Sequence, residues 1–148
     1  MNPIETYWKR FLETNGLDPS TPYFEAFAFG SGERMAEELL QLVLEGKKRA
    51  TTSSVLAFGE HRLPAVGDYS VVLDGKGNPR CVIRTMKTLR MTFSKMDFET
   101  AVKEGEDDSL ESWQRNHEYF FGLESKELGY PFTPDMPILF EEFDVVFQ

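Results

Sequence analysis

Apolar residues follow helical spacing in two segments of the first third of the chain. Within Pro3–Thr14, Tyr7 and Phe11 lie about one helical turn apart. Within Glu33–Glu45 the apolar positions again share one face, and Gly46 follows as a C-cap glycine would. The pattern therefore predicts two amphipathic helices, with the stretch between them containing a short strand or an extended lead-in at Tyr23–Phe29.

From Thr51 onward the pattern changes to short extended segments in which apolar and polar positions alternate. The segments expected to form strands are Tyr69–Leu73, Arg80–Thr88 with Leu89–Phe93 as a continuation or a separate strand, and Ile138–Phe147. Helical spacing returns in Phe98–Lys103 and again from Leu110 to about Phe121, where Gly122 marks the expected end. These elements predict an α+β fold: helices flanking a small mixed, mostly antiparallel sheet or barrel.

Composition indicates one ordinary globular domain spanning residues 1–148. Hydrophobic residues make up 41% of the chain and charged residues 28%. Cys81 is the single cysteine, which argues against a disulfide scaffold or a thiolate zinc site. No apolar run approaches the roughly 20 residues of a membrane span, and the first residues lack the regions of a signal peptide. We therefore expect a cytoplasmic protein with no membrane partner.

Charge is segregated along the chain, although the net charge is −9. Residues 47–95 carry ten basic and three acidic side chains, whereas both flanking regions are acidic. The basic middle either creates a local positive field over a site for an anionic or nucleotide-like ligand, or is neutralised by the flanks in the fold. Binding to duplex DNA is disfavoured, because duplex affinity depends on neutralising many phosphates at once.

A lysine and a threonine that are three positions apart form the first candidate site. Lys48 and Thr51 lie where the second predicted helix passes into the first extended segment, a corner at which the two side chains can converge. A desolvated lysine amine can take the proton of a hydroxyl and make it a nucleophile. The alternative is structural, because lysines complement helix C-termini and threonines commonly begin strands.

A second candidate stretch contains Glu104, on a loop between two predicted helices, from which a carboxylate can reach into a cleft. The acidic residues that follow it do not have the spacing of a calcium loop, so no metal site is expected. His117 shares an apolar face with Trp113, which favours a packed or pocket-wall histidine, and His61 lies in a polar loop. No glycine-rich phosphate loop is present, so no cofactor is expected.

The two stretches together resemble the ASCH domain family. The family signature Gly-x-Lys-x-x-Thr-x-Ser is matched by Gly46, Lys48, Thr51 and Ser53. A second block resembles the longer ASCH proteins; it comprises Glu104-Gly105-Glu106-Asp107-Asp108-Ser109-Leu110, then Trp113, His117 and Phe120-Phe121. The resemblance extends from about residue 24 to the C-terminus. Residues 1–23 are then a helical extension, which either packs on the domain or forms the face of a homodimer.

The resemblance implies a PUA-like β-barrel with flanking helices. One branch of small ASCH proteins removes the acetyl group from N4-acetylcytidine with a lysine, a threonine and a glutamate, and these roles carry over to Lys48, Thr51 and Glu104. The residues expected to bind the ligand are Arg49, Ser53, Arg84, Trp113 and His117. Arg84 departs from the pattern, since many relatives carry a glutamate at its position.

Three functions therefore follow from the sequence and its resemblance. The first is an amidohydrolase whose cleft recognises a nucleobase or modified nucleoside, with Thr51 attacking, Lys48 accepting its proton and Glu104 passing a proton to the leaving amine. The second is an RNA-binding module or ribonuclease that takes single-stranded RNA as its partner. The third is a protein-interaction domain without catalysis.

Overall fold

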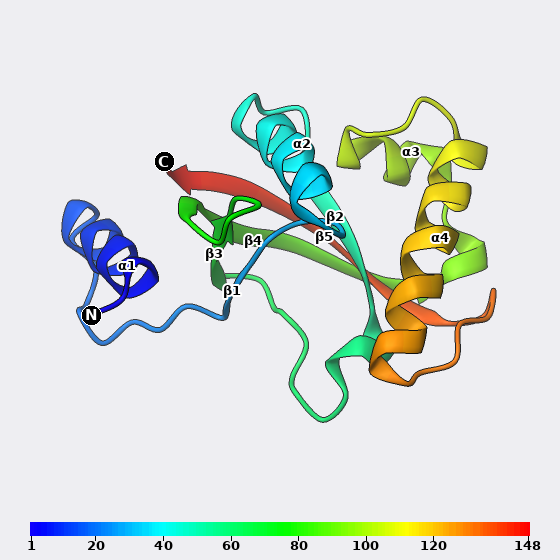
Figure 1. Cartoon of the computed structure of the whole chain (residues 1–148), viewed down its shortest axis with the longest axis horizontal. Coiled ribbons are helices and arrows are strands. Elements are labelled where there is room, and N and C mark those ends of the chain that lie inside the picture. Colours follow the sequence, from blue (N-terminus) through cyan, green and yellow to red (C-terminus); the bar gives the residue numbers. More distant parts are fainter.

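The computed structural model describes residues 1–148, and Figure 1 shows helices arranged around a curled sheet. The helices are α1 (Pro3–Thr14), α2 (Glu33–Leu44), α3 (Phe98–Ala101) and α4 (Leu110–Leu128), with single 3-10 turns at Val55–Phe58, Phe93–Lys95 and Val102–Glu104. The strands are β1 (Glu25–Phe27), β2 (Ala50–Ser54), β3 (Tyr69–Leu73), β4 (Pro79–Thr92) and β5 (Pro137–Phe147).

The five strands form one sheet in the order β1-β3-β4-β5-β2. The β1–β3 pair is parallel, whereas the other three pairs are antiparallel. The two long strands, β4 and β5, cross the molecule together and curl the sheet into a half-barrel (Figure 1). This architecture confirms the α+β fold of mostly antiparallel strands that the sequence predicts.

The long strand β4 resolves the choice between one strand and two. It is continuous over 14 residues, but its register against β5 shifts between Thr85 and Lys87. An irregularity of this kind inserts an extra residue and changes the alternation of inward and outward side chains. The shift therefore interrupts the alternation of apolar and polar positions, although β4 itself is one continuous strand.

The longest helix, α4, extends beyond its predicted end. Gly122 lies inside the helix, which continues to Leu128 and ends at Gly129 with a left-handed φ of +81°. The prediction was wrong because a glycine inside a helix costs only about 1 kcal/mol, which the packing of neighbouring turns can offset. One such neighbour is the fully buried Phe121.

Strand β3 is buried on both faces, and this places the helices. Val71 packs with Trp8 and Phe11 of α1, whereas Val72 packs with Leu40 of α2. Since consecutive strand residues point to opposite faces, α1 and α2 cover opposite sides of the sheet. The N-terminal helix is therefore packed on the domain through an apolar cluster of its own.

The third apolar cluster joins α4 to the far ends of the long strands. It contains Trp113 and Phe121 from α4, Phe93 after β4, and Ile138 from β5. This packing fixes one face of α4 against the end of the sheet, and the same face carries the side chains of the candidate site. No helix of the protein is both long enough and apolar enough to cross a membrane.

Truncating Phe11 tests the packing of α1. Phe11 is 2% exposed, so Phe11→Ala is expected to lower the free energy of unfolding by about 3–5 kcal/mol through lost burial and a residual cavity. Urea denaturation measures the change. The exposed Lys9 on the same helix supplies the control, and Lys9→Ala should change the free energy by less than about 0.5 kcal/mol. Equal effects would show that α1 does not pack on the sheet.

Candidate active site

Lys48 lies in the turn between α2 and β2, and its side chain is buried. Gly46 has a φ of +79°, a conformation that suits glycine and ends the helix. The backbone N–H groups of Lys47 and Lys48 both donate to the carbonyl of Leu42. The turn leaves the Lys48 side chain only 1% exposed.

The Lys48 ammonium is held between a carbonyl and two carboxylates. Its Nζ donates to the Ala50 carbonyl at 2.8 Å and to Glu106 Oε2 at 2.6 Å. The nearer oxygen of Glu104, Oε1, lies 3.5 Å away. Because an ammonium has three N–H donors, two are firmly bonded and the third is the least constrained.

Glu104 is the most buried acid of the site and is surrounded by donors. Thr52 Oγ1 and Trp113 Nε1 donate to its Oε2 at 2.8 and 2.6 Å, and His117 Nε2 lies 3.3 Å from its Oε1. Burial alone would raise the pKa of Glu104, but the Lys48 charge and the hydrogen bonds from His117 and Trp113 outweigh it and lower the pKa to about 2. Glu104 is therefore a fixed anion.

The two neighbours of His117 favour the charged form of its ring. Its Nδ1 lies 2.8 Å from the Trp113 carbonyl, which can only accept, while Nε2 faces the Glu104 carboxylate, which also accepts. Two acceptors facing the two ring nitrogens favour the form of the ring that carries a proton on each nitrogen. Burial opposes the charge, but the bond to Glu104 outweighs it and raises the pKa of His117.

Gly105 allows the acidic loop to approach the lysine turn. Its φ is +73°, and a Cβ at this position would collide with the carbonyl of Lys47. The two segments are also tied by the backbone N–H of Arg49, which donates to the Lys103 carbonyl at 3.1 Å. Close backbone contact thus places Glu104 and Glu106 on either side of Gly105 and beside Lys48.

Two adjoining cavities open beside this cluster. The small one, of about 100 Å³, is lined by Lys48, Thr51, Glu104 and His117 among others. The large one, of about 760 Å³, shares with it Phe29, Gly30, Thr51, Thr52 and Phe120. Thr51 therefore lies at the junction, between the buried charges and the larger space.

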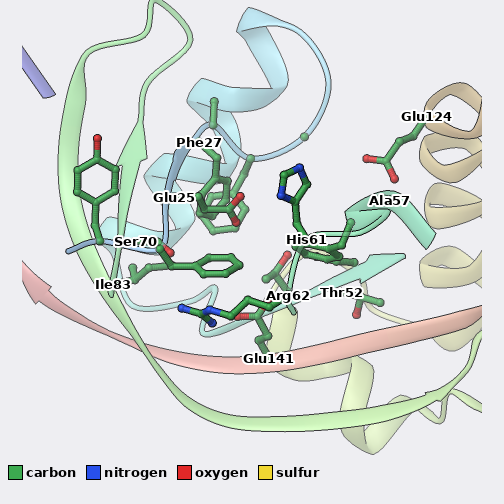
Figure 2. A pocket seen from close by; sticks show the side chains of 18 of the residues that line it. Glu25, Phe27, Thr52, Ala57, His61, Arg62, Ser70, Ile83, Glu124 and Glu141 are labelled. Carbon is green, nitrogen blue, oxygen red and sulfur yellow. The ribbon is translucent and has the colours of Figure 1, made fainter. Parts of the chain in front are cut away.

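The large cavity is aromatic and acidic. Figure 2 shows Glu25, Glu124 and Glu141 reaching it from three different elements, β1, α4 and β5. Arg62 also lines it, but its guanidinium bonds both oxygens of Asp68, at 2.7 and 3.1 Å. Among the lysines and arginines of residues 47–95, only Arg62 lines this cavity, and its charge is already paired with Asp68. The basic residues 47–95 therefore do not place a positive field over this cavity, which was one of the two alternatives for their role.

Comparison with known protein families identifies the family of this chain. The ASCH domain family matches residues 25–147. The chain belongs to the ASCH domain family. This finding confirms the resemblance drawn from the two sequence blocks, and the PUA-like fold, often linked to RNA binding, agrees with the curled sheet.

Two crystal structures resemble this ASCH domain over nearly its whole length. A protein of Enterococcus faecalis V583 from family DUF984 is 34% identical with a TM-score of 0.89, and the match covers 98% of this chain and 88% of that one. An ASCH domain from Lactobacillus crispatus JV V101 is 30% identical with a TM-score of 0.88, covering 100% and 97%. No curated protein matches the chain.

The structure brings most of the predicted site residues of the ASCH domain together. Lys48, Thr51, Glu104 and His117 line the small cavity, and Ser53 lines the large one. Trp113 is fully buried behind the site, where it bonds Glu104.

Two predicted ligand-binding residues lie elsewhere. Arg49 and Arg84 line neither cavity, and the Arg84 guanidinium lies over the Tyr69 ring at 5.4 Å. Arg84 thus lies outside the two cavities that the other predicted residues line. The register of β3 against β4 pairs Arg84 with Tyr69, a partnership that the linear sequence does not reveal.

Sequence reasoning missed three residues that the structure places at the site. Thr52 bonds Glu104, Glu106 bonds Lys48, and Glu141 lines the large cavity. Glu106 had a weak signal, since it is two residues after Glu104 across a glycine. Glu141 had none, because only strand pairing brings β5 beside β2.

Gly105→Ala tests the close approach of the two segments. The substitution introduces an unfavourable φ and a collision with Lys47, and we expect the free energy of unfolding to fall by at least about 1–3 kcal/mol. Gly122→Ala is the matched control, since nothing lies within 4 Å of its Cβ position and alanine favours a helix by about 0.5–1 kcal/mol. Thermal or urea unfolding that ranks the two variants in the opposite order would contradict the proposed geometry.

Acid titration tests the buried carboxylate. Because folding lowers the pKa of Glu104, its ionised carboxyl stabilises the folded protein. This contribution to the free energy of unfolding is fully present above the unfolded pKa near 4.5 and is lost as the pH falls toward 2. The stability advantage of the wild type over Glu104→Gln should therefore be about 3–5 kcal/mol near pH 6 and should shrink below pH 4.5. Urea unfolding across this range measures it, and a pH-independent difference would contradict the assignment.

Proposed function

We propose that this ASCH domain hydrolyses the amide bond of an N4-acylated cytidine-type nucleoside, with Thr51 as the nucleophile. The observation that supports the proposal is the convergence of Lys48, Thr51 and Glu104, from two distant segments, on one small pocket. These residues match by motif position the lysine, threonine and glutamate of the amidohydrolase branch. The proposed substrate is thus a small molecule, and no cofactor is invoked.

The large cavity suits a ligand of this size and shape. Its volume of about 760 Å³ lies within the range of about 300–1,000 Å³ typical of small-molecule sites. Among its lining residues are the rings of Tyr23, Phe24, Phe27 and Phe58, against which a flat base can pack. A base bound there would present its acylated amine toward Thr51, at the junction with the small pocket.

In the proposed reaction the acyl group passes through Thr51. The Lys48 ammonium gives one proton to the amide nitrogen, and the neutral amine that this leaves takes the proton of Thr51 as the Thr51 oxygen bonds to the acyl carbon. The carbon–nitrogen bond then breaks and the amine leaves uncharged. Water attacks the resulting ester, its proton returns through Lys48 to the Thr51 oxygen, and the carboxylic acid is released.

Glu104 has a different role here from the proton shuttle expected from the sequence. An acid that receives three hydrogen-bond donors and faces an ammonium gives up its negative charge reluctantly. We therefore assign the proton relay to Lys48 and propose that Glu104 holds the Lys48 amine in place. The third N–H of Lys48 is the one available to the substrate.

Binding of single-stranded RNA remains the second function to be tested against this one. The charges of the large cavity favour the nucleoside, because the carboxylates of Glu25 and Glu124 oppose a phosphate backbone. A small uncharged ligand meets no such repulsion. We therefore propose a free nucleoside as the partner of this cavity.

Removing the Thr51 hydroxyl tests the proposed reaction. Thr51→Val keeps the shape of the side chain, and we expect cytidine release from N4-acetylcytidine to fall at least about 100-fold, whereas Thr51→Ser should retain much of it. Chromatography of the nucleoside measures the rate, and circular dichroism checks the fold.

Lysine variants supply the matched pair for this assay. Lys48→Ala should lose turnover, while Lys47→Ala, at an exposed neighbouring position, should keep the wild-type rate. Full activity of Thr51→Val or Lys48→Ala, or no turnover by the wild type, would overturn the proposed function.

A further inference from the structure

Glu141 lies directly across the sheet from the proposed nucleophile. The antiparallel pairing of β2 with β5 sets Thr51 opposite Glu141, and opposed residues of such a pair have Cβ atoms roughly 4.5–5.5 Å apart on the same face. Both side chains line the large cavity. A molecule that contacts Glu141 in this cavity is therefore within reach of Thr51.

The Glu141 carboxyl is oriented by a neighbouring strand. Thr85 of β4 is buried, and its hydroxyl donates to Glu141 Oε2 at 3.2 Å. No basic side chain forms an ion pair with Glu141, although its neighbour Glu142 pairs with Lys87 and Lys103. One hydroxyl thus fixes the group, and its remaining hydrogen-bonding capacity faces the cavity.

We propose that Glu141, as an uncharged carboxylic acid, binds the edge of an aminopyrimidine ring and so positions the substrate of Thr51. A carboxylic acid offers a donor beside an acceptor. Its O–H donates to the ring nitrogen N3, and its carbonyl oxygen accepts from the N–H on N4. The ligand class is a base in which a ring-nitrogen acceptor stands beside an exocyclic N–H.

The pairing also explains why this carboxyl stands beside the nucleophile. This step rests on the proposed function, because the acyl carbon of the substrate is bonded to the same N4. Holding N4–H against Glu141 places that carbon beside Thr51 on the adjoining strand. Glu141 is then a positioning residue for the reaction, and its effect is exerted through the bound base.

Charges around Glu141 favour its uncharged form. Burial, together with the negative charges of Glu25 and Asp68, raises the pKa of Glu141 to about 7, although the hydrogen bond from the Thr85 hydroxyl acts in the opposite direction. Arg62, the nearby cation of the cavity wall, is occupied by Asp68, and His61 also lines the cavity. Thr51 of β2 and Thr88 of β4 lie opposite Glu141 in the sheet, and Thr85 of β4 donates to its carboxyl, so these two strands present only hydroxyl residues to it. Affinity for the base should therefore fall as pH rises through 7.

Calorimetric binding of cytidine, the reaction product, tests the inference without requiring turnover. We expect the dissociation constant of the wild type to rise about tenfold between pH 6 and pH 8, as the uncharged fraction of a group with a pKa of about 7 falls about tenfold. Glu141→Gln keeps a donor beside an acceptor, so it should bind cytidine with the pH 6 affinity at both pH values. Glu141→Ala should bind at least about tenfold more weakly at pH 6.

Two controls make the test specific. Glu142→Gln removes a carboxyl at the adjacent position, outside the cavity, and should reproduce the wild-type profile. N4,N4-dimethylcytidine lacks the N–H on N4, and the wild type should bind it at least about tenfold more weakly than cytidine. A pH-independent affinity of the wild type, weak binding by Glu141→Gln, or no cytidine binding would overturn the inference.

Failure of the inference is distinguishable from failure of the proposed function. Cytidine binding with this pH profile but no hydrolysis of N4-acetylcytidine would sustain the Glu141 site and reject Thr51 as a nucleophile. Hydrolysis that depends on Thr51, together with cytidine binding that is unchanged in the Glu141 variants, would support Thr51 as the nucleophile and reject the Glu141 site.

Discussion

The burial of the Lys48 ammonium beside Glu104 is the constraint on which the site depends. Neither charge can be buried alone without a cost of several kcal/mol, so each requires the other together with the hydrogen bonds of Thr52, Trp113 and His117. This requirement joins the turn after α2, strand β2, the acidic loop and helix α4. Their convergence leaves a pocket at the place where the four segments meet.

Thr51 and Thr52 show how a single strand serves two environments. Thr52 bonds the buried Glu104, whereas Thr51 lies at the junction of the two cavities. On one side of Thr51 the charges are paired and fixed; on the other the space is lined by rings and carboxyls. A hydroxyl at such a boundary can receive a substrate from the larger space and exchange protons with the smaller one.

Local sequence signals were sufficient for most of the fold, whereas the family resemblance was needed to bring Lys48 and Glu104 into one site. Periodicity located α1, α2, β3 and β5 closely, because each has one dominant apolar face or a clear alternation. It failed at Gly122, where packing overrides helix propensity, and it could not place Arg84, because strand register decides the neighbour of that residue. Glu141 was beyond reach for the same reason, since its relation to Thr51 exists only through the pairing of β2 with β5.

The most direct test of the account follows the acyl group itself. Wild-type protein in excess over N4-acetylcytidine, quenched with acid during the first turnover and analysed by peptide mass spectrometry, should carry an acetyl ester on Thr51 while cytidine is released. Thr51→Val should carry none. Release of cytidine throughout the first turnover with Thr51 always unmodified would contradict the account.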